Sequence, residues 1–319
     1  MPKSIIFLTR SLPDEAMLEI GSAFDLRQNA FDRPLTKNEL KEGLLEADGL
    51  ISMLSDPIDR ETIEGAPRLK IIANYAVGYN NIDLAAARAK GIAVTNTPGV
   101  LTETTADLCW ALLMATARRI PEADRWVKSG VWTGWAPTQV LGRDIYGKTL
   151  GIVGMGRIGQ AVARRAAGFS MRVSYFSRTR QHELEKSLGL NDLPLQELLG
   201  SSDYLSLHLP LTEKTRHIID KAALESMKPG AILINTARGP IVDEQALIAA
   251  LKAGRIAGAG LDVFEDEPRI SSELLQLDNV VTLPHIGSAS FETRLEMGRL
   301  VYVNLCAFFS NKRPPNMVE

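Results

Sequence analysis

The sequence lacks the cysteines, the long apolar runs and the basic excess that are typical of disulfide-rich, membrane and nucleic-acid-binding proteins. It has only two cysteines, Cys109 and Cys306, both in apolar helix-like runs, which predicts buried thiols rather than a disulfide or a metal site. No apolar run approaches the ~20 residues that span a bilayer, and the one in MPKSIIFLTR is too short for a signal peptide. A net charge of −2 leaves no basic excess for nucleic acid or membrane surfaces. We therefore expect a cytoplasmic protein without a metal, nucleic-acid or membrane partner.

What is present is an ordinary globular composition in a chain long enough for two domains. The chain has 319 residues, of which 45% are hydrophobic. Short β-rich runs alternate with helical patterns along its length, which is typical of βαβ units. The runs are almost continuously apolar, as in strands covered on both faces. We predict an α/β fold of two doubly wound, Rossmann-like parallel-sheet domains, with a ligand cleft between them.

The β-rich runs fall into two series on either side of a helical region. The first series is SIIFL, DGLISML, LKIIANYA and GIAVTN, and the second is TLGIVG, MRVSYFS, YLSLHLP, AILINTA, AGAGLDVF and NVVTLPH. Between them we expect a long helix capped by Thr102, and a shorter one that starts with proline and ends at Gly130. An irregular loop with Trp132 and Trp135 follows. Aromatic side chains in such a loop pack onto the surface beneath them or across a subunit interface more often than they bind a ligand.

A dinucleotide fingerprint opens the second series. Gly154-Met155-Gly156-Arg157-Ile158-Gly159 follows the run TLGIV and starts the helix RIGQAVARRAAG. Glycines at this spacing allow a tight turn, close approach of a pyrophosphate and close helix–strand packing. The free N–H groups of the helix N-terminus favour the pyrophosphate charge. The residues predicted to bind the cofactor here are Met155, Gly156, Arg157 and Ile158.

The segment VSYFSRTR lacks the carboxylate with which NAD enzymes bind the adenosine ribose. It has Ser177, Arg178 and Thr179 instead, two hydroxyls around a guanidinium that suit the 2′-phosphate of NADP. The alternative is that Arg178 and Arg180 belong to a solvated surface loop. We predict that NADP(H) is preferred and that NAD(H) is still accepted.

Three residues follow strand runs in the second series: Arg238 in INTARGPIVDE, Glu267 in GLDVFEDEP and His285 in TLPHIGSAS. Strand C-termini of a parallel sheet share one edge, so these residues should converge. Arginine suits a substrate carboxylate, histidine a transferred proton, and a carboxylate orients the histidine ring. Each also has a structural alternative, such as a pairing of Arg238 with Asp243. The other strand and helix-start histidines, His208 and His217, have no evident acidic partner in the sequence.

With these motifs the chain resembles the D-isomer-specific 2-hydroxyacid dehydrogenases over essentially its whole length, through GIVGMGRIGQAVA, MKPGAILINTARGPIVDEQALIAAL, GLDVFEDEP and NVVTLPHIGSAS. The resemblance implies a catalytic set of Arg238, Glu267 and His285, with His285 as acid/base. It also implies a discontinuous substrate-binding domain, 1–99 plus 288–319, and a dinucleotide-binding domain with dimerisation elements, 100–287. Further implied cofactor-binding residues are Pro210, Thr236, Ala237, Arg238, Asp262, His285 and Gly287. Implied substrate-binding residues are Val77, Gly78, Arg238, His285 and Ser288.

Within this family the chain is most similar to glyoxylate/hydroxypyruvate reductases, through NYAVGYNNID, TNTPGVLTETTADL, YFSRTR and HIGSAS. The resemblance implies an NADPH-linked homodimer that reduces small 2-oxo acids. Related reductases commonly have a second aromatic residue where this chain has Gln139, which leaves a 2-ketogluconate-type reductase as an alternative. The corepressor scaffolds that resemble the family are a second alternative, against which no long disordered extension or partner-peptide segment is visible. Phosphite, phosphoglycerate and formate oxidation fit the motifs less well.

Overall fold

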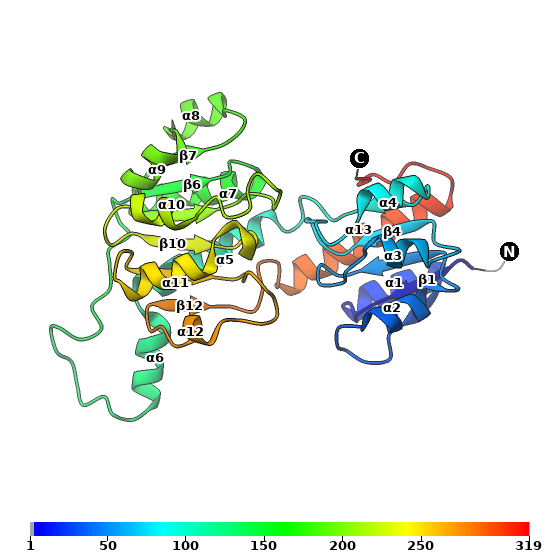
Figure 1. The fold of residues 1–319 in the computed structure, drawn as a ribbon, viewed down its shortest axis with the longest axis horizontal. Coiled ribbons are helices and arrows are strands. Elements are labelled where there is room, and N and C mark those ends of the chain that lie inside the picture. The colour runs from blue at the N-terminus through cyan, green and yellow to red at the C-terminus, as the bar shows by residue number, and fades with distance from the viewer. Residues whose placement is uncertain (1–2, 319) are drawn as a thin grey trace. The chain divides into compact units, whose positions relative to one another are not determined.

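The computed structural model describes residues 3–318, which divide into two compact α/β units, each built on one parallel sheet (Figure 1). The five-stranded unit contains residues 3–101 and 288–318, and the seven-stranded unit contains Thr102–Gly287. This architecture confirms the predicted fold class. No helix within residues 3–318 has the length and apolar character needed to cross a membrane.

The five-stranded sheet has the order β2-β1-β3-β4-β5, and all its neighbouring strands pair in parallel. Its strands are β1 (Ile5–Leu8), β2 (Asp25–Gln28), β3 (Gly49–Ser52), β4 (Ile71–Asn74) and β5 (Ala93–Thr95). The chain reverses its direction of winding between β1 and β3, so the loops after these strands meet at the carboxyl edge. Such a switch point is where open α/β sheets bind ligands.

Helices cover both faces of this sheet. They are α1 (Asp14–Ala23), α2 (Lys37–Leu44), α3 (Arg60–Glu64), α4 (Leu84–Ala89) and α13 (Phe291–Phe309). Side chains of α2, α3 and α4 share one apolar core with the strands, among them Leu40, Ile63 and Ala86. On the other face α13 packs on β4 and α1, so closely that a Cβ on Gly298 would lie 2.4 Å from the Cβ of Ala16.

The seven-stranded sheet has the order β12-β11-β10-β9-β6-β7-β8 and is also wholly parallel. Its strands are β6 (Thr149–Val153), β7 (Arg172–Phe176), β8 (Asn191–Asp192), β9 (Tyr204–Leu207), β10 (Ile232–Asn235), β11 (Gly258–Leu261) and β12 (Val280–Thr282). Its switch point lies between β6 and β9. The predicted dinucleotide loop follows β6, and it therefore starts at the position where this fold binds ligands.

The helices of this unit also form two layers. They are α5 (Thr102–Ala117), α6 (Ile120–Lys128), α7 (Arg157–Ala166), α8 (His182–Leu188), α9 (Leu195–Ser201), α10 (Lys221–Ser226), α11 (Glu244–Lys252) and α12 (Ser272–Leu275). Helices α5 and α7 contribute to one apolar core, and α9, α10, α11 and α12 contribute to the other. Helix α6 and the following loop project from the unit (Figure 1). Cys109 is a fully buried free thiol on α5, and Cys306 is a partly buried free thiol on α13.

Three local features differ from the sequence expectations or refine them. Strands β2 and β8 are not evident in the sequence, because β2 is a polar edge strand and β8 has only two residues. Thr102 does not cap α5 but is its first residue. The expected irregular loop is confirmed, since residues 129–148 contain neither helix nor strand.

Candidate active site

The glycine loop after β6 is closely packed on one side and open on the other. Gly154 has φ +102°, and a Cβ there would lie 2.7 Å from the carbonyl oxygen of His208. A Cβ on Gly159 would lie 2.2 Å from the carbonyl oxygen of Gly154, so α7 and β6 approach to a distance that only glycine allows. Gly156, in contrast, has no atom within 4 Å of its Cβ position. The motif therefore leaves an open space at the N-terminus of α7.

The other fingerprint residues have different environments. The Met155 side chain is 2% exposed and belongs to the apolar core, so only its backbone is free for a ligand. Ile158 is half-buried against the same core, and Arg157 is exposed. Gly156 occupies the N-cap position of α7, and no side chain caps this end. The first N–H groups of α7 are therefore not capped by a side chain, as a site for a pyrophosphate requires.

The segment after β7 contains the residues predicted to bind the 2′-phosphate. Ser177 is half-buried, and Arg178 and Thr179 are exposed. Arg180 differs from Arg178, because its guanidinium makes two contacts with the Glu185 carboxylate, at 2.9 and 3.0 Å. The two arginines of this segment therefore have different surroundings.

Two buried polar atoms near the carboxyl edge of the seven-stranded sheet lack a hydrogen-bond partner. Asp262 follows β11 and is fully buried; its Oδ1 accepts the N–H of Ile286 at 2.7 Å, while Oδ2 makes no hydrogen bond. Burial raises the pKa of this carboxyl group. The Oγ1 of Thr236, directly after β10, is also buried without a partner. Buried orphan atoms are costly in a finished core, which suggests that a ligand supplies their partners.

Arg238, Glu267 and His285 follow three neighbouring strands, β10, β11 and β12. His285 Nδ1 lies 2.8 Å from Glu267 Oε2, and Glu267 Oε1 accepts the N–H of Phe264 at 3.0 Å. His285 has φ +55°, in the left-handed region, which is uncommon for a residue with a side chain. This contact leaves Nε2 as the imidazole nitrogen available to a substrate.

The electrostatics of the trio support their expected roles. Burial alone would raise the pKa of Glu267, but the hydrogen bond and charge of His285 oppose it, so that the pKa lies below its usual value. Glu267 is therefore ionised near neutral pH. Burial lowers the pKa of the Arg238 guanidinium, and the charge of Glu267 opposes that shift. Arginine stays charged despite such shifts, so the site combines a half-buried cation with a histidine–carboxylate pair.

Close backbone packing brings the loops of Arg238 and Glu267 together. A Cβ on Gly239 would lie 1.8 Å from the carbonyl oxygen of Phe264, so the two loops touch where glycine is required. The side chain of Asn235, 1% exposed, donates to the carbonyl of Arg238 at 2.9 Å. These contacts position Arg238 from beneath, a role that the sequence did not reveal for Asn235.

The remaining predicted cofactor residues of this unit lie in the same loops. Pro210 is exposed in the loop after β9, Ala237 follows Thr236, and Gly287 is buried two residues after His285. A Cβ on Gly287 would lie 3.3 Å from Asp262 Oδ2. Within residues 3–318 no group of three or more His, Cys, Asp or Glu side chains is arranged to hold a metal ion.

Two further histidines of this unit, His208 and His217, have clear structural environments. The ring of His208 bonds Ser206 Oγ through Nε2 at 2.8 Å, and burial lowers its pKa to about 4. The absence of an acidic partner for His217 was a wrong expectation, because its Nε2 lies 2.6 Å from Glu265 Oε1. The loop after β11 brings Glu265 to His217 across 48 residues, a proximity that sequence spacing does not show.

Val77, Gly78 and Ser288 belong to the five-stranded unit. Val77 and Gly78 follow β4, and the side chain of Asn74, which is fully buried, donates to the carbonyl of Gly78 at 2.8 Å. Ser288 is half-buried and is the first residue of this unit's second segment. Asn74 therefore supports the loop expected to bind the substrate.

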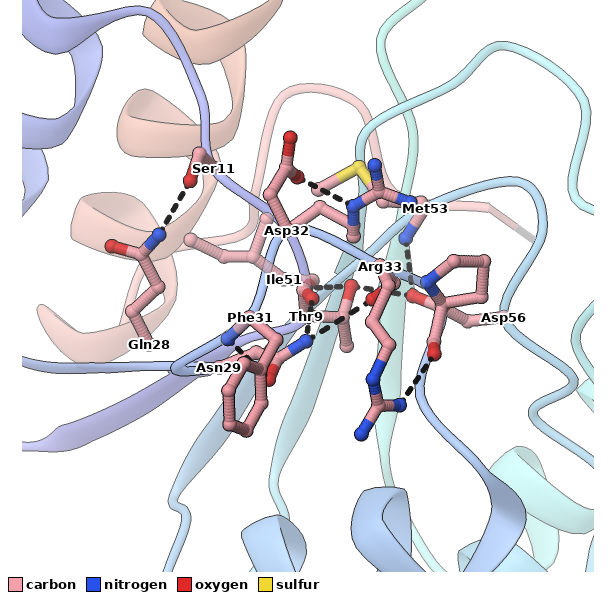
Figure 2. Close-up of polar contacts among 12 residues, drawn as sticks. Thr9, Ser11, Gln28, Asn29, Phe31, Asp32, Arg33, Ile51, Met53 and Asp56 are labelled. Atoms are coloured by element: carbon pink, nitrogen blue, oxygen red, sulfur yellow. Dashed lines mark hydrogen bonds and ion pairs between the residues drawn. The ribbon is translucent and has the colours of Figure 1, made fainter.

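The loop after β3 in the same unit is equally well supported. Figure 2 shows the Asp56 carboxylate bonded to the hydroxyl of Thr9 at 2.5 Å and to the N–H of Met53 at 2.7 Å. Asp56 is 3% exposed, and burial raises its pKa. Asn81 ties the adjacent loop to this one by donating to the carbonyls of Met53 and Asp56 at 3.0 Å. Hydrogen bonds therefore connect the loops at the switch point of this sheet.

Gln139, where related reductases commonly have an aromatic residue, is held within its own loop. Its Oε1 accepts the N–H of Ala136 at 3.0 Å, and its Nε2 donates to the carbonyl of Gly134 at 2.9 Å. Around it the side chains of Trp132 and Trp135 are 49% and 83% exposed. Gln139 thus stabilises a loop that presents tryptophans outward.

Known proteins are similar to this chain over most of its length. Residues 110–287 match the family model described as D-isomer specific 2-hydroxyacid dehydrogenase, NAD binding domain. The chain is 54% identical to the glyoxylate reductase of Korarchaeum cryptofilum, over 99% of this chain and 96% of that enzyme. It is 51% identical to that of Pyrococcus furiosus, with the same coverage. An NADPH-dependent glyoxylate/hydroxypyruvate reductase from Sinorhizobium meliloti, solved with NADP and malonate, superposes with a TM-score of 0.89 at 35% identity, covering 99% of this chain and 97% of that one.

Proposed function

Because the chain belongs to the D-isomer-specific 2-hydroxyacid dehydrogenase family and is therefore an NAD(P)-dependent dehydrogenase, we propose that it reduces glyoxylate and hydroxypyruvate to D-2-hydroxy acids, with NADPH as the preferred reductant. The observation that carries this proposal is the 2.8 Å contact of His285 with Glu267, whose loop packs closely against the loop of Arg238. The relatives named glyoxylate reductase support the substrate class.

The residues of the seven-stranded unit fit a nicotinamide dinucleotide. The open space at Gly156 and the uncapped end of α7 suit the pyrophosphate. The orphan oxygens of Asp262 and Thr236 are acceptors suited to polar N–H or O–H groups of the cofactor. When bound, the nicotinamide supplies the hydride for the substrate carbonyl. Pro210, Ala237 and Gly287 are proposed to line the same site.

His285 and Glu267 form the proton-transfer pair. With Nδ1–H donated to Glu267, the protonated ring presents Nε2–H to the carbonyl oxygen of a 2-oxo acid. Transfer of this proton completes the alcohol, and the Glu267 carboxylate stabilises the charged ring before the transfer. After the transfer the ring is neutral and takes a proton from solvent for the next turnover.

Arg238 is the proposed carboxylate-binding residue. Its guanidinium can bind a carboxylate with two parallel hydrogen bonds, which orients the adjacent carbonyl. In the five-stranded unit, the backbone N–H groups of Val77 and Gly78, and Ser288, are proposed as further substrate-binding groups. Asn74 fixes Gly78 from below, so this loop needs little reorganisation on binding.

Two further features complete the proposal. Ser177, Arg178 and Thr179 are proposed to bind the 2′-phosphate, since none of these three residues directly after β7 is a carboxylate that would repel it. We also propose a homodimer in which a second copy covers α6 and residues 131–146. Helix α6 has no buried residue, and its Ile120 and Val127 are more than half exposed beside the tryptophan loop. Exposed apolar surface of this kind marks interfaces.

The test is a set of initial rates with glyoxylate, hydroxypyruvate and 2-ketogluconate, each with NADPH and NADH. We expect fast NADPH oxidation with the two small acids. Activity confined to 2-ketogluconate would make this a keto sugar acid reductase, and nucleotide binding without turnover would make it a scaffold. The His285→Ala variant should lose roughly 10²–10⁴-fold in kcat and keep its affinity for NADPH.

A further inference from the structure

We propose that Tyr175 and Glu185 are positioning residues for cofactor selection: they hold the segment 177–179 in the shape that binds the 2′-phosphate of NADPH. This inference rests on the proposed NADPH preference. It concerns residues of β7 and α8 that the fingerprint of the dinucleotide loop does not include.

Hydrogen bonds connect the residues on either side of the segment 177–179. Tyr175, fully buried on β7, accepts the backbone N–H of Gln181 through its hydroxyl oxygen at 2.8 Å. The same hydroxyl donates to Glu185 Oε1 at 2.7 Å. The Gln181 side chain donates back to the carbonyl of Thr179 at 3.2 Å. One phenol group thus ties the far end of the segment to the strand from which it starts.

Glu185 also binds the guanidinium of Arg180, so that this group is not available to bind a phosphate. The guanidinium of Arg180 binds both carboxylate oxygens of Glu185, and Asp192 lies 3.8 Å from it. The hydrogen bonds from Arg180 and Tyr175 lower the pKa of Glu185 to about 2, so the carboxylate stays ionised. The positive charge of Arg180 in turn compensates the negative charge of Glu185, which would otherwise repel the 2′-phosphate.

The side chains of Ser177, Arg178 and Thr179 are left uncommitted. Within residues 3–318 none of these three side chains has a hydrogen bond or an ion pair to the rest of the chain, although their backbone is tied at both ends. Three free donors on a fixed backbone form a preorganised phosphate site, which binds at a lower entropic cost than a mobile loop. NADH has no 2′-phosphate and gains little from this arrangement.

The main test is the Tyr175→Phe variant, which removes the hydroxyl and retains the ring. We expect KM for NADPH to rise roughly fivefold to twentyfold, as for one or two lost hydrogen bonds, while KM for NADH changes less than about twofold. kcat should be unchanged. In an Arg178→Ala background the effect of Tyr175→Phe on KM for NADPH should become clearly smaller, because part of that effect acts through Arg178.

A second variant, Glu185→Gln, separates support from direct contact. If Arg180 supports the segment, its release should raise KM for NADPH selectively. A lower KM would mean that a freed Arg180 binds the phosphate, and an unchanged KM would mean that Glu185 does not support the segment. Either result would overturn the proposal. The matched control is Tyr204→Phe, which removes another buried hydroxyl of this unit, bonded to the carbonyl of Asp144 at 2.8 Å. It should leave the ratio of the two KM values unchanged.

The outcomes separate this inference from the proposal on which it rests. A wild-type enzyme without preference for NADPH overturns both. A wild-type preference that survives in Tyr175→Phe overturns only the positioning role. Equal losses with both cofactors, or a loss that persists undiminished in the Arg178→Ala background, would show that Tyr175 merely stabilises the fold.

Discussion

The two glycines Gly156 and Gly159 lie three residues apart, and we predict opposite consequences of replacing each with alanine. Gly159→Ala should destabilise the fold, because its Cβ would meet the backbone oxygen of Gly154 at 2.2 Å. Gly156→Ala should leave the fold intact, because nothing lies within 4 Å of its Cβ position and its φ of −76° suits alanine. It should instead remove the space in which a pyrophosphate binds.

The magnitudes follow from these environments. Overpacking costs up to about 3 kcal/mol, and alanine recovers about 1 kcal/mol over glycine inside a helix, so Gly159→Ala should lose about 2 kcal/mol. For a unit of this size that loss lowers Tm by roughly 4–8 °C. At Gly156, alanine is the poorer N-cap, which lowers stability, but it also makes the unfolded chain stiffer, which raises stability. The two effects nearly cancel, so the free energy of unfolding should change by no more than about 0.5 kcal/mol. Losing one charge-assisted hydrogen bond to the pyrophosphate should weaken NADPH binding roughly 10- to 150-fold.

The assay pairs thermal unfolding of both variants without nucleotide with NADPH titration followed by fluorescence. Gly156→Ala should unfold like the wild type and bind NADPH weakly, while Gly159→Ala should unfold at lower temperature. Normal NADPH affinity in Gly156→Ala would refute the assignment of this loop to the pyrophosphate. A large fall in its Tm would refute the claim that the position is open.

Three other predictions address the remaining parts of the site. Glu267→Gln should lower kcat roughly 10- to 100-fold, as for a lost charged hydrogen bond to His285. The folded pKa of Glu267 lies below 4.5, so the stability that its ionised carboxylate contributes is present above pH 4.5 and is lost at lower pH. The difference in Tm between wild type and variant should therefore close on acidification, and a constant difference would contradict this. Trp135→Ser should weaken a dimer at least about 30-fold in sedimentation with little change in monomer stability, whereas an unchanged mass would place the interface elsewhere. Asn74→Ala should raise KM for glyoxylate roughly fivefold by releasing Gly78, with a smaller effect on kcat; an unaltered KM would separate this loop from the substrate.

Most of the fold was predictable because its signals are local. Apolar runs of strand length, a glycine fingerprint between a strand and a helix, and the alternation of elements all depend on neighbouring residues. Strand β2 (Asp25–Gln28) was not predicted, because its sequence is polar. It lies at an exposed sheet edge, where burial imposes no apolar pattern. The irregular loop around Trp132 was evident from its lack of periodicity.

The sequence by itself determined the fold class, the family and the residue types available for hydride-transfer chemistry, since these are written in contiguous motifs. Only the tertiary structure decided which side chains meet. It paired His217 with Glu265 and committed Arg180 to Glu185 while leaving Arg178 free. It also left an oxygen of Asp262 buried without a partner. The physical reason is that parallel strands bring distant loops to one sheet edge, where distances of about 3 Å depend on packing over the whole unit rather than on spacing along the chain.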